Sequence, residues 1–135
     1  MTRQPEPMVW PGLRYDDAPA AIRFLTEVFG FTEMLVVPGE NGAVAHAELA
    51  WPDGGAVMLG SNSHTQGVHE PTPPGTSSTY VVSVDAAGVD AVYQRVKNAR
   101  VAVIADLHDT DYGSHGFTCR DPEGNMWTFG TYRGA

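Results

Sequence analysis

The sequence repeats itself at a separation of about 70 residues, and this repeat constrains the fold more than any other feature. The matching pairs are Phe24 and Tyr93, Pro52 and Pro122, and Gly54 and Gly124, which lie 69, 70 and 70 residues apart. Each set runs through an amphipathic stretch and then a Pro- and Gly-containing turn. A near-constant spacing across two such elements indicates an internal duplication.

The first half reads as a strand, a helix and three more strands. Asp16 and Asp17 provide an acidic cap and Pro19 fits the first helical turn, while Gly30 ends the helix. Pro11 places the first strand at a sheet edge or an irregular start. The predicted strands are Val9–Tyr15, Thr32–Val37, Val44–Ala50 and Ala56–Ser61.

The second half repeats this order. Its helix is marked by Val89, Val92, Tyr93 and Val96 at three- and four-residue steps. The predicted strands are Thr79–Val84, Val101–Ile104, Gly116–Arg120 and Met126–Tyr132. We therefore predict one α+β domain, residues 1–135, whose two βαβββ modules (about 8–61 and 79–133) are joined by a loop, 62–78. The modules form a cupped mixed sheet; each helix covers one sheet face, and the free faces are the expected place for function.

Charge and composition exclude several classes of protein. Eight Lys and Arg against sixteen Asp and Glu give a net charge of −8, which opposes binding to nucleic acid. The single cysteine, Cys119, suits a reducing compartment. The start resembles no signal peptide, and no apolar run approaches the roughly 18 residues of a membrane span. We expect a cytoplasmic protein with no membrane partner.

Two segments carry a family resemblance. The helix from Asp17 to Phe24 and the ending Arg120–Trp127 resemble the vicinal oxygen chelate superfamily, which contains glyoxalase I, bleomycin-resistance proteins and extradiol dioxygenases. The similarity spans about Val9 to Tyr132, and Asp109–Gly113 with the ending is similar to the glyoxalase-like subgroup. The resemblance implies the paired-module fold. It also implies a divalent metal held by one residue from the first and one from the last strand of each module.

The implied metal positions fall on residues of the wrong chemistry. Counting from the helix start and the hairpin turn places them at Trp10, Met58, Thr79 and Thr128. None of these is a usual ligand for a hard or borderline divalent ion. We therefore expect no metal and no other cofactor at the family's site, and this argues against metal-dependent catalysis while leaving open whether the chain is an enzyme.

A relocated metal site is the alternative. Alternation along Val44–Ala50 places His46 and Glu48 on the pocket side, and His115 or His69 are the candidates to complete a set. The simpler interpretation is that Glu48 pairs with Arg120 or Arg14 and that His46 hydrogen-bonds within the sheet.

Other side chains divide between pocket and core. Trp10 is either a stacking platform for a planar ligand or a packing residue, and Arg14, Met58, Thr79 and Thr128 are the candidates to line the pocket with it. Tyr112 and His115 are candidates for the rim. The loop residues His64, His69 and Glu70 are expected to be solvated, Asp109 and Asp111 to form local turn bonds, and Cys119, Trp127 and Phe129 to be core.

Three functions remain at this point. The first is metal-free binding of an aromatic natural product or antibiotic, as the bleomycin-resistance branch implies, with the pocket at a homodimer interface. The second is a metal-dependent lyase, isomerase or dioxygenase using His46 and Glu48. The third is a relative without activity.

Overall fold

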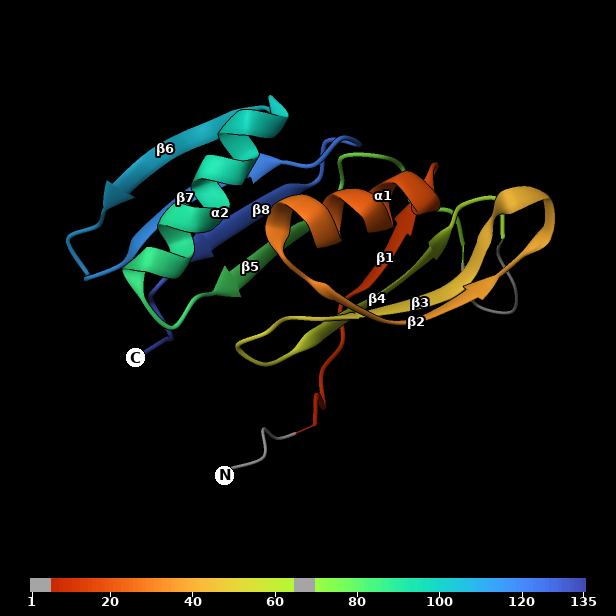
Figure 1. The fold of residues 1–135 in the computed structure, drawn as a ribbon, viewed down its shortest axis with the longest axis horizontal. Coiled ribbons are helices and arrows are strands. Elements are labelled where there is room, and N and C mark those ends of the chain that lie inside the picture. Colours follow the sequence, from red (N-terminus) through yellow and green to blue (C-terminus); the bar gives the residue numbers. More distant parts are fainter. Residues whose placement is uncertain (1–5, 65–69) are drawn as a thin grey trace. The chain divides into compact units, whose positions relative to one another are not determined.

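The computed structural model describes residues 6–64 and 70–135 and divides the chain into two units, Met1–Pro73 and Pro74–Ala135. Each unit has the order β-α-β-β-β, which confirms the predicted pair of βαβββ modules and the α+β class (Figure 1). Unit one contains β1 (Gly12–Tyr15), α1 (Ala18–Phe24), β2 (Thr32–Pro38), β3 (Val44–Ala50) and β4 (Ala56–Ser61). Unit two contains β5 (Ser78–Val82), α2 (Ala86–Ala99), β6 (Val103–Asp109), β7 (His115–Arg120) and β8 (Met126–Gly130).

The sheet of unit one has the order β1-β4-β3-β2, with β1 parallel to β4 and the other pairs antiparallel. The Asp17 side chain caps α1 by accepting from the Ala20 N–H at 3.1 Å. The helix continues as a π-helical turn, Leu25–Phe29, and Gly30 ends it with a left-handed φ of 97°. These local signals place α1 over one face of its sheet (Figure 1).

The covered face of unit one is apolar and the other face is not. Leu13 and Tyr15 on β1 and Ala47 and Leu49 on β3 are at most 5% exposed, so alternate residues of both strands point into the core under α1. Phe29, fully buried, fills the same core from the helical side. The residues between them therefore face away from α1.

Unit two repeats this design, with the order β5-β8-β7-β6 and one parallel pair, β5 with β8. Asp85 caps α2 by accepting from the Gly88 N–H at 2.8 Å. Trp127 and Phe129 on β8 and Cys119 on β7 have no exposed surface, which confirms that they are core residues.

Two strand boundaries differ from the prediction. β1 begins at Gly12 rather than at residue 9, and the Pro11 carbonyl marks its entry by accepting from the Met58 N–H. The strand predicted at 101–104 is wrong at both ends, since β6 spans Val103–Asp109. Because β6 is an edge strand with alternately exposed residues, polar side chains such as Asp106 and His108 continue the strand where an apolar criterion stops it. Within the described residues no helix is long and apolar enough to cross a membrane.

Candidate functional site

The sheet face of unit one that α1 does not cover carries the main candidate site, which we call the open face. Directly paired residues on neighbouring strands point to the same side of a sheet, so the register defines its members. One row runs Leu35, Glu48, Met58 and Gly12 across β2, β3, β4 and β1. A second row pairs Val37 with His46 and Gly60 with Arg14. The prediction that His46 and Glu48 leave the core side of β3 is thus confirmed.

His46 and Glu48 form a dyad on the open face. The His46 Nε2 atom lies 2.8 Å from the Glu48 Oε2 atom, and the two side chains are 39% and 33% exposed. An ionised carboxylate only accepts hydrogen bonds, so the proton of a neutral His46 ring resides on Nε2. The expectation that Glu48 pairs with an arginine is wrong, because each arginine is engaged elsewhere: Arg14 as described next, and Arg120 with the Gly124 carbonyl at 2.8 Å.

Arg14 lies flat across Gly60 on the open face. Its Nη2 donates to the Ser61 carbonyl at 2.6 Å and also to the His64 carbonyl. The Nε atom is buried without a hydrogen-bond partner, and burial lowers the pKa of the guanidinium from its ordinary value. No carboxylate among the described residues forms an ion pair with it. Arg14 therefore fastens the segment after β4 to the sheet.

The metal positions that the resemblance implies can be assigned on the structure. In unit one the register pairs Gly12 with Met58, so the residue facing Met58 is glycine and not Trp10, which precedes β1 and donates to the Pro7 carbonyl. Glycine and methionine provide no imidazole or carboxylate.

The equivalent pair in unit two also differs from the prediction. Tyr80 pairs with Thr128, whereas Thr79 pairs with the fully buried Trp127. Thr79 therefore points to the helix side of its sheet, and the expectation that it shares a face with Thr128 is wrong. The Thr128 hydroxyl lies 2.8 Å from that of Thr118, and the Tyr80 hydroxyl donates to the Tyr132 carbonyl at 2.7 Å. Tyrosine and threonine are poor ligands for a borderline divalent ion.

His115 does not reach the open side of its sheet. Its Nε2 atom lies 2.7 Å from Asp90 Oδ1 on α2, and its Nδ1 atom lies 2.7 Å from Asp109 Oδ1. Hydrogen bonds to these two carboxylates raise the pKa of His115. The predicted roles as rim residue and metal ligand are not supported, because His115 shares the helix side with Phe117, which is 1% exposed.

The remaining candidates have ordinary structural surroundings. Tyr112, 64% exposed, packs edge to face on Tyr132 with ring centroids 5.2 Å apart. Burial raises the pKa of Cys119 to about 12, which makes it an unreactive core thiol, as predicted. Glu70 is exposed, and His69 lies outside the described residues.

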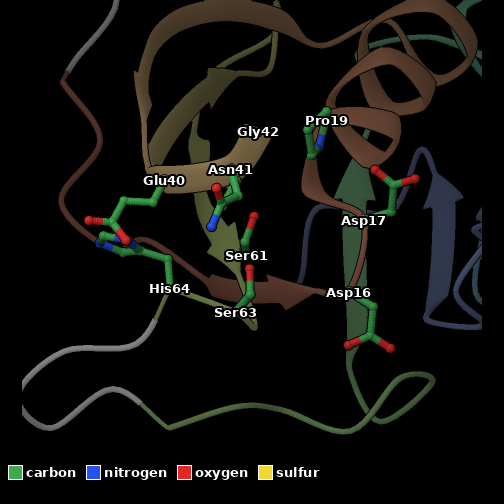
Figure 2. A pocket seen from close by; sticks show the side chains of 10 residues that line it. Asp16, Asp17, Pro19, Glu40, Asn41, Gly42, Ser61, Ser63 and His64 are labelled. Carbon is green, nitrogen blue, oxygen red and sulfur yellow. The ribbon is translucent and has the colours of Figure 1, made fainter.

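Unit one also contains a cavity of about 470 Å³ at the end of β1. Figure 2 shows Asp16 and Asp17 on one side of it and Glu40, Asn41 and His64 on the other. Its lining residues are Asp16, Asp17, Pro19, Glu40, Asn41, Gly42, Ala43, Ser61, Ser63 and His64.

Several polar groups of the cavity wall already have structural partners. Asp16 accepts from the Asn62 amide at 2.7 Å, Asp17 caps α1, and the Ser61 hydroxyl accepts from the Val44 N–H at 2.8 Å. Sequence reasoning missed this cavity, since only strand pairing brings its three segments together and no local motif marks it. Within residues 6–64 and 70–135 no three His, Cys, Asp or Glu residues gather in a way that could hold a metal ion.

Comparisons with known proteins agree with this architecture. Residues 8–129 match the model of the Glyoxalase/Bleomycin resistance protein/Dioxygenase superfamily. The protein Rv0887c of Mycobacterium tuberculosis is 35% identical over 127 residues, covering 93% of this chain and 74% of the relative. The crystal structure of TioX from Micromonospora sp. ML1 is similar with a TM-score of 0.70 and 26% identity, covering 90% of this chain and 97% of that one.

A lactoylglutathione lyase from Agrobacterium tumefaciens shares the fold, with a TM-score of 0.70 and 24% identity over 93% of each chain. The match to the family model extends from before β1 to the last core residue of β8, and so covers both modules and the open face. The chain belongs to the Glyoxalase/Bleomycin resistance protein/Dioxygenase superfamily.

Proposed function

We propose that this chain is a metal-independent small-molecule-binding protein that holds an aromatic natural product or antibiotic without converting it. The observation that carries the proposal is the chemistry at the metal positions implied by the family. Gly12 with Met58, and Tyr80 with Thr128, replace the imidazole and carboxylate groups that a divalent ion needs. Residues of this kind contact organic molecules better than they coordinate ions.

The composition of the open face supports binding. Leu35 and Val37 are 43% and 40% exposed, and they flank the His46–Glu48 dyad. Ligand sites typically combine apolar side chains with a few polar groups that fix orientation. Met58 adds an adaptable thioether beside Glu48.

We further propose that the protein acts as a homodimer in the cytoplasm. This follows from the bleomycin-resistance proteins that share its family, and sedimentation of the purified chain measures it directly. A monomer at every concentration would remove the dimer from the proposal and leave the open face as a site of one chain.

Metal analysis separates the proposal from its alternative. Untagged protein purified without chelator should contain less than about 0.1 equivalent of any divalent ion by mass spectrometry, before and after incubation with zinc, nickel, iron or manganese. About one equivalent of one ion, lost in both His46→Ala and Glu48→Ala variants, would establish the metal-dependent alternative instead. A ligand screen by tryptophan fluorescence then tests binding in the metal-free protein.

A further inference from the structure

The hydrogen-bonding capacity of the His46–Glu48 dyad is only partly used. With Nε2 donating to Glu48, the Nδ1 atom of a neutral His46 ring is an acceptor. No group among the described residues hydrogen-bonds to this Nδ1 atom, although the ring is only 39% exposed. The carboxylate thus fixes the tautomer that leaves an acceptor available.

The surroundings of this acceptor are apolar or empty. Val37 pairs directly with His46, and Leu35 and Met58 pair with Glu48 from either side. Next to Met58, a side chain built at Gly12 would meet nothing within 4 Å, so the row ends in free space. An acceptor within exposed apolar surface matches a ligand that has one donor on a hydrocarbon body.

Charge narrows the ligand class further. Glu48 places a negative charge beside the acceptor, which disfavours an anionic ligand group. The positive charge nearest in the register, on Arg14, is already engaged by the Ser61 and His64 carbonyls. A neutral hydroxyl is the donor that this arrangement favours.

We propose that His46 is a specificity-determining residue that accepts a hydrogen bond at Nδ1 from the hydroxyl of a neutral phenol or alcohol bound on the open face. Leu35, Val37 and Met58 contact the hydrocarbon part, and Glu48 is a positioning residue that holds the histidine tautomer. This inference rests on the proposed binding function and names its ligand class.

A matched pair of probes tests the hydroxyl. 2-Naphthol and 2-methoxynaphthalene have the same rings, but only the first can donate a hydrogen bond. Titrations of full-length protein at pH 7.5, followed by NMR of the Met58 methyl group and the His46 ring nitrogens, should give a Kd at least about tenfold lower for 2-naphthol. The ring nitrogen shifts of the free protein should show Nε2 protonated and Nδ1 unprotonated.

Variants assign the preference to the dyad. His46→Phe should reduce the preference for 2-naphthol to about onefold and leave the Kd of 2-methoxynaphthalene unchanged. The control His108→Phe alters a histidine of unit two, whose Nδ1 lies 2.8 Å from the Asp106 carbonyl, and should keep the full preference. Gly12→Leu should weaken both probes, because it fills the free space beside Met58.

Three results would overturn the inference. Equal affinity for both probes on the open face would show recognition by shape alone, and would leave the proposed binding function intact. Binding that shifts neither the Met58 nor the His46 signals would place the ligand elsewhere. No shift with either probe at its solubility limit would remove this face as a site for aromatic alcohols, whereas failure of the broader binding proposal would appear as bound metal.

Discussion

Two glycines on the open face provide a matched test of how Arg14 is held. A Cβ atom at Gly60 would lie 2.7 Å from Arg14 Nη1 and 3.1 Å from the Ala45 carbonyl, whereas one at Gly12 would meet nothing within 4 Å. The Ala45 carbonyl belongs to the backbone and cannot easily move. Gly60→Ala should therefore displace the guanidinium, while Gly12→Ala should not disturb the structure.

The expected cost follows from the bonds that Arg14 makes. Hydrogen bonds to a charged group are worth about 1.5–3 kcal/mol each, and Arg14 donates to two carbonyls. Exposure of the segment to water after displacement recovers part of this, and replacing glycine by alanine stabilises by about 0.4–1 kcal/mol through the unfolded state. We expect Gly60→Ala to lower the free energy of unfolding by about 2 kcal/mol, and Gly12→Ala to raise it by about 0.5 kcal/mol.

Urea denaturation measures both effects. With a slope of about 1–3 kcal/mol per molar, the two midpoints should differ by about 1–2 M. Amide hydrogen exchange at residues 62–64, the segment that Arg14 fastens, should accelerate only in Gly60→Ala. In an Arg14→Ala background the cost of Gly60→Ala should fall to nearly zero, since the group that clashes is absent. An undiminished cost in that background would refute the reasoning and assign the strain to the Ala45 carbonyl.

Two further predictions concern unit two. The pKa of His115 is raised in the folded state by Asp90 and Asp109, so its stabilising effect is complete below its unfolded pKa of about 6.5 and is lost as pH rises through the folded value; urea titrations from pH 5 to 9 should show a decline of about 1 kcal/mol that is absent in His115→Gln, and an equal decline in the variant would contradict this. The 4%-exposed Asp121 accepts from the Trp127 indole at 3.0 Å, so Asp121→Asn, which places an amide donor against a donor in one of its two orientations, should cost about 2 kcal/mol and shift tryptophan fluorescence, whereas unchanged stability would show that the turn rearranges freely.

The architecture was predictable because its signals are local and repeated. The spacing near 70 residues, the caps at Asp17 and Asp85 and the two hairpin turns each agree with the structure. Alternation from the buried Cys119 also predicts the side on which His115 lies, four residues earlier, and applying it would have excluded His115 from the pocket. The cavity in unit one had no such signal, since its walls come from three segments that strand pairing alone brings together.

The metal positions were misplaced by a difference between the two modules. Residues 16 and 17 separate β1 from α1, whereas residues 83–85 separate β5 from α2. An offset of 69 measured in the helices therefore exceeds by one the offset of 68 that pairs Gly12 with Tyr80 in the strands. Because side chains alternate along a strand, an error of one residue moves a predicted site to the opposite face, and this is what happened at Thr79.

The same comparison shows how the duplicated modules have diverged. The position beside Met58 is Gly12, around which a Cβ would find free space, while its counterpart beside Thr128 is Tyr80. The Tyr80 ring covers Gly130, where a Cβ would lie 2.8 Å from its hydroxyl oxygen. One module has thus lost the side chain at this position and the other has filled it with a ring bonded to its own backbone. Neither retains a metal ligand there, and only unit one combines the free space with an available acceptor, which is why we assign ligand recognition to its face.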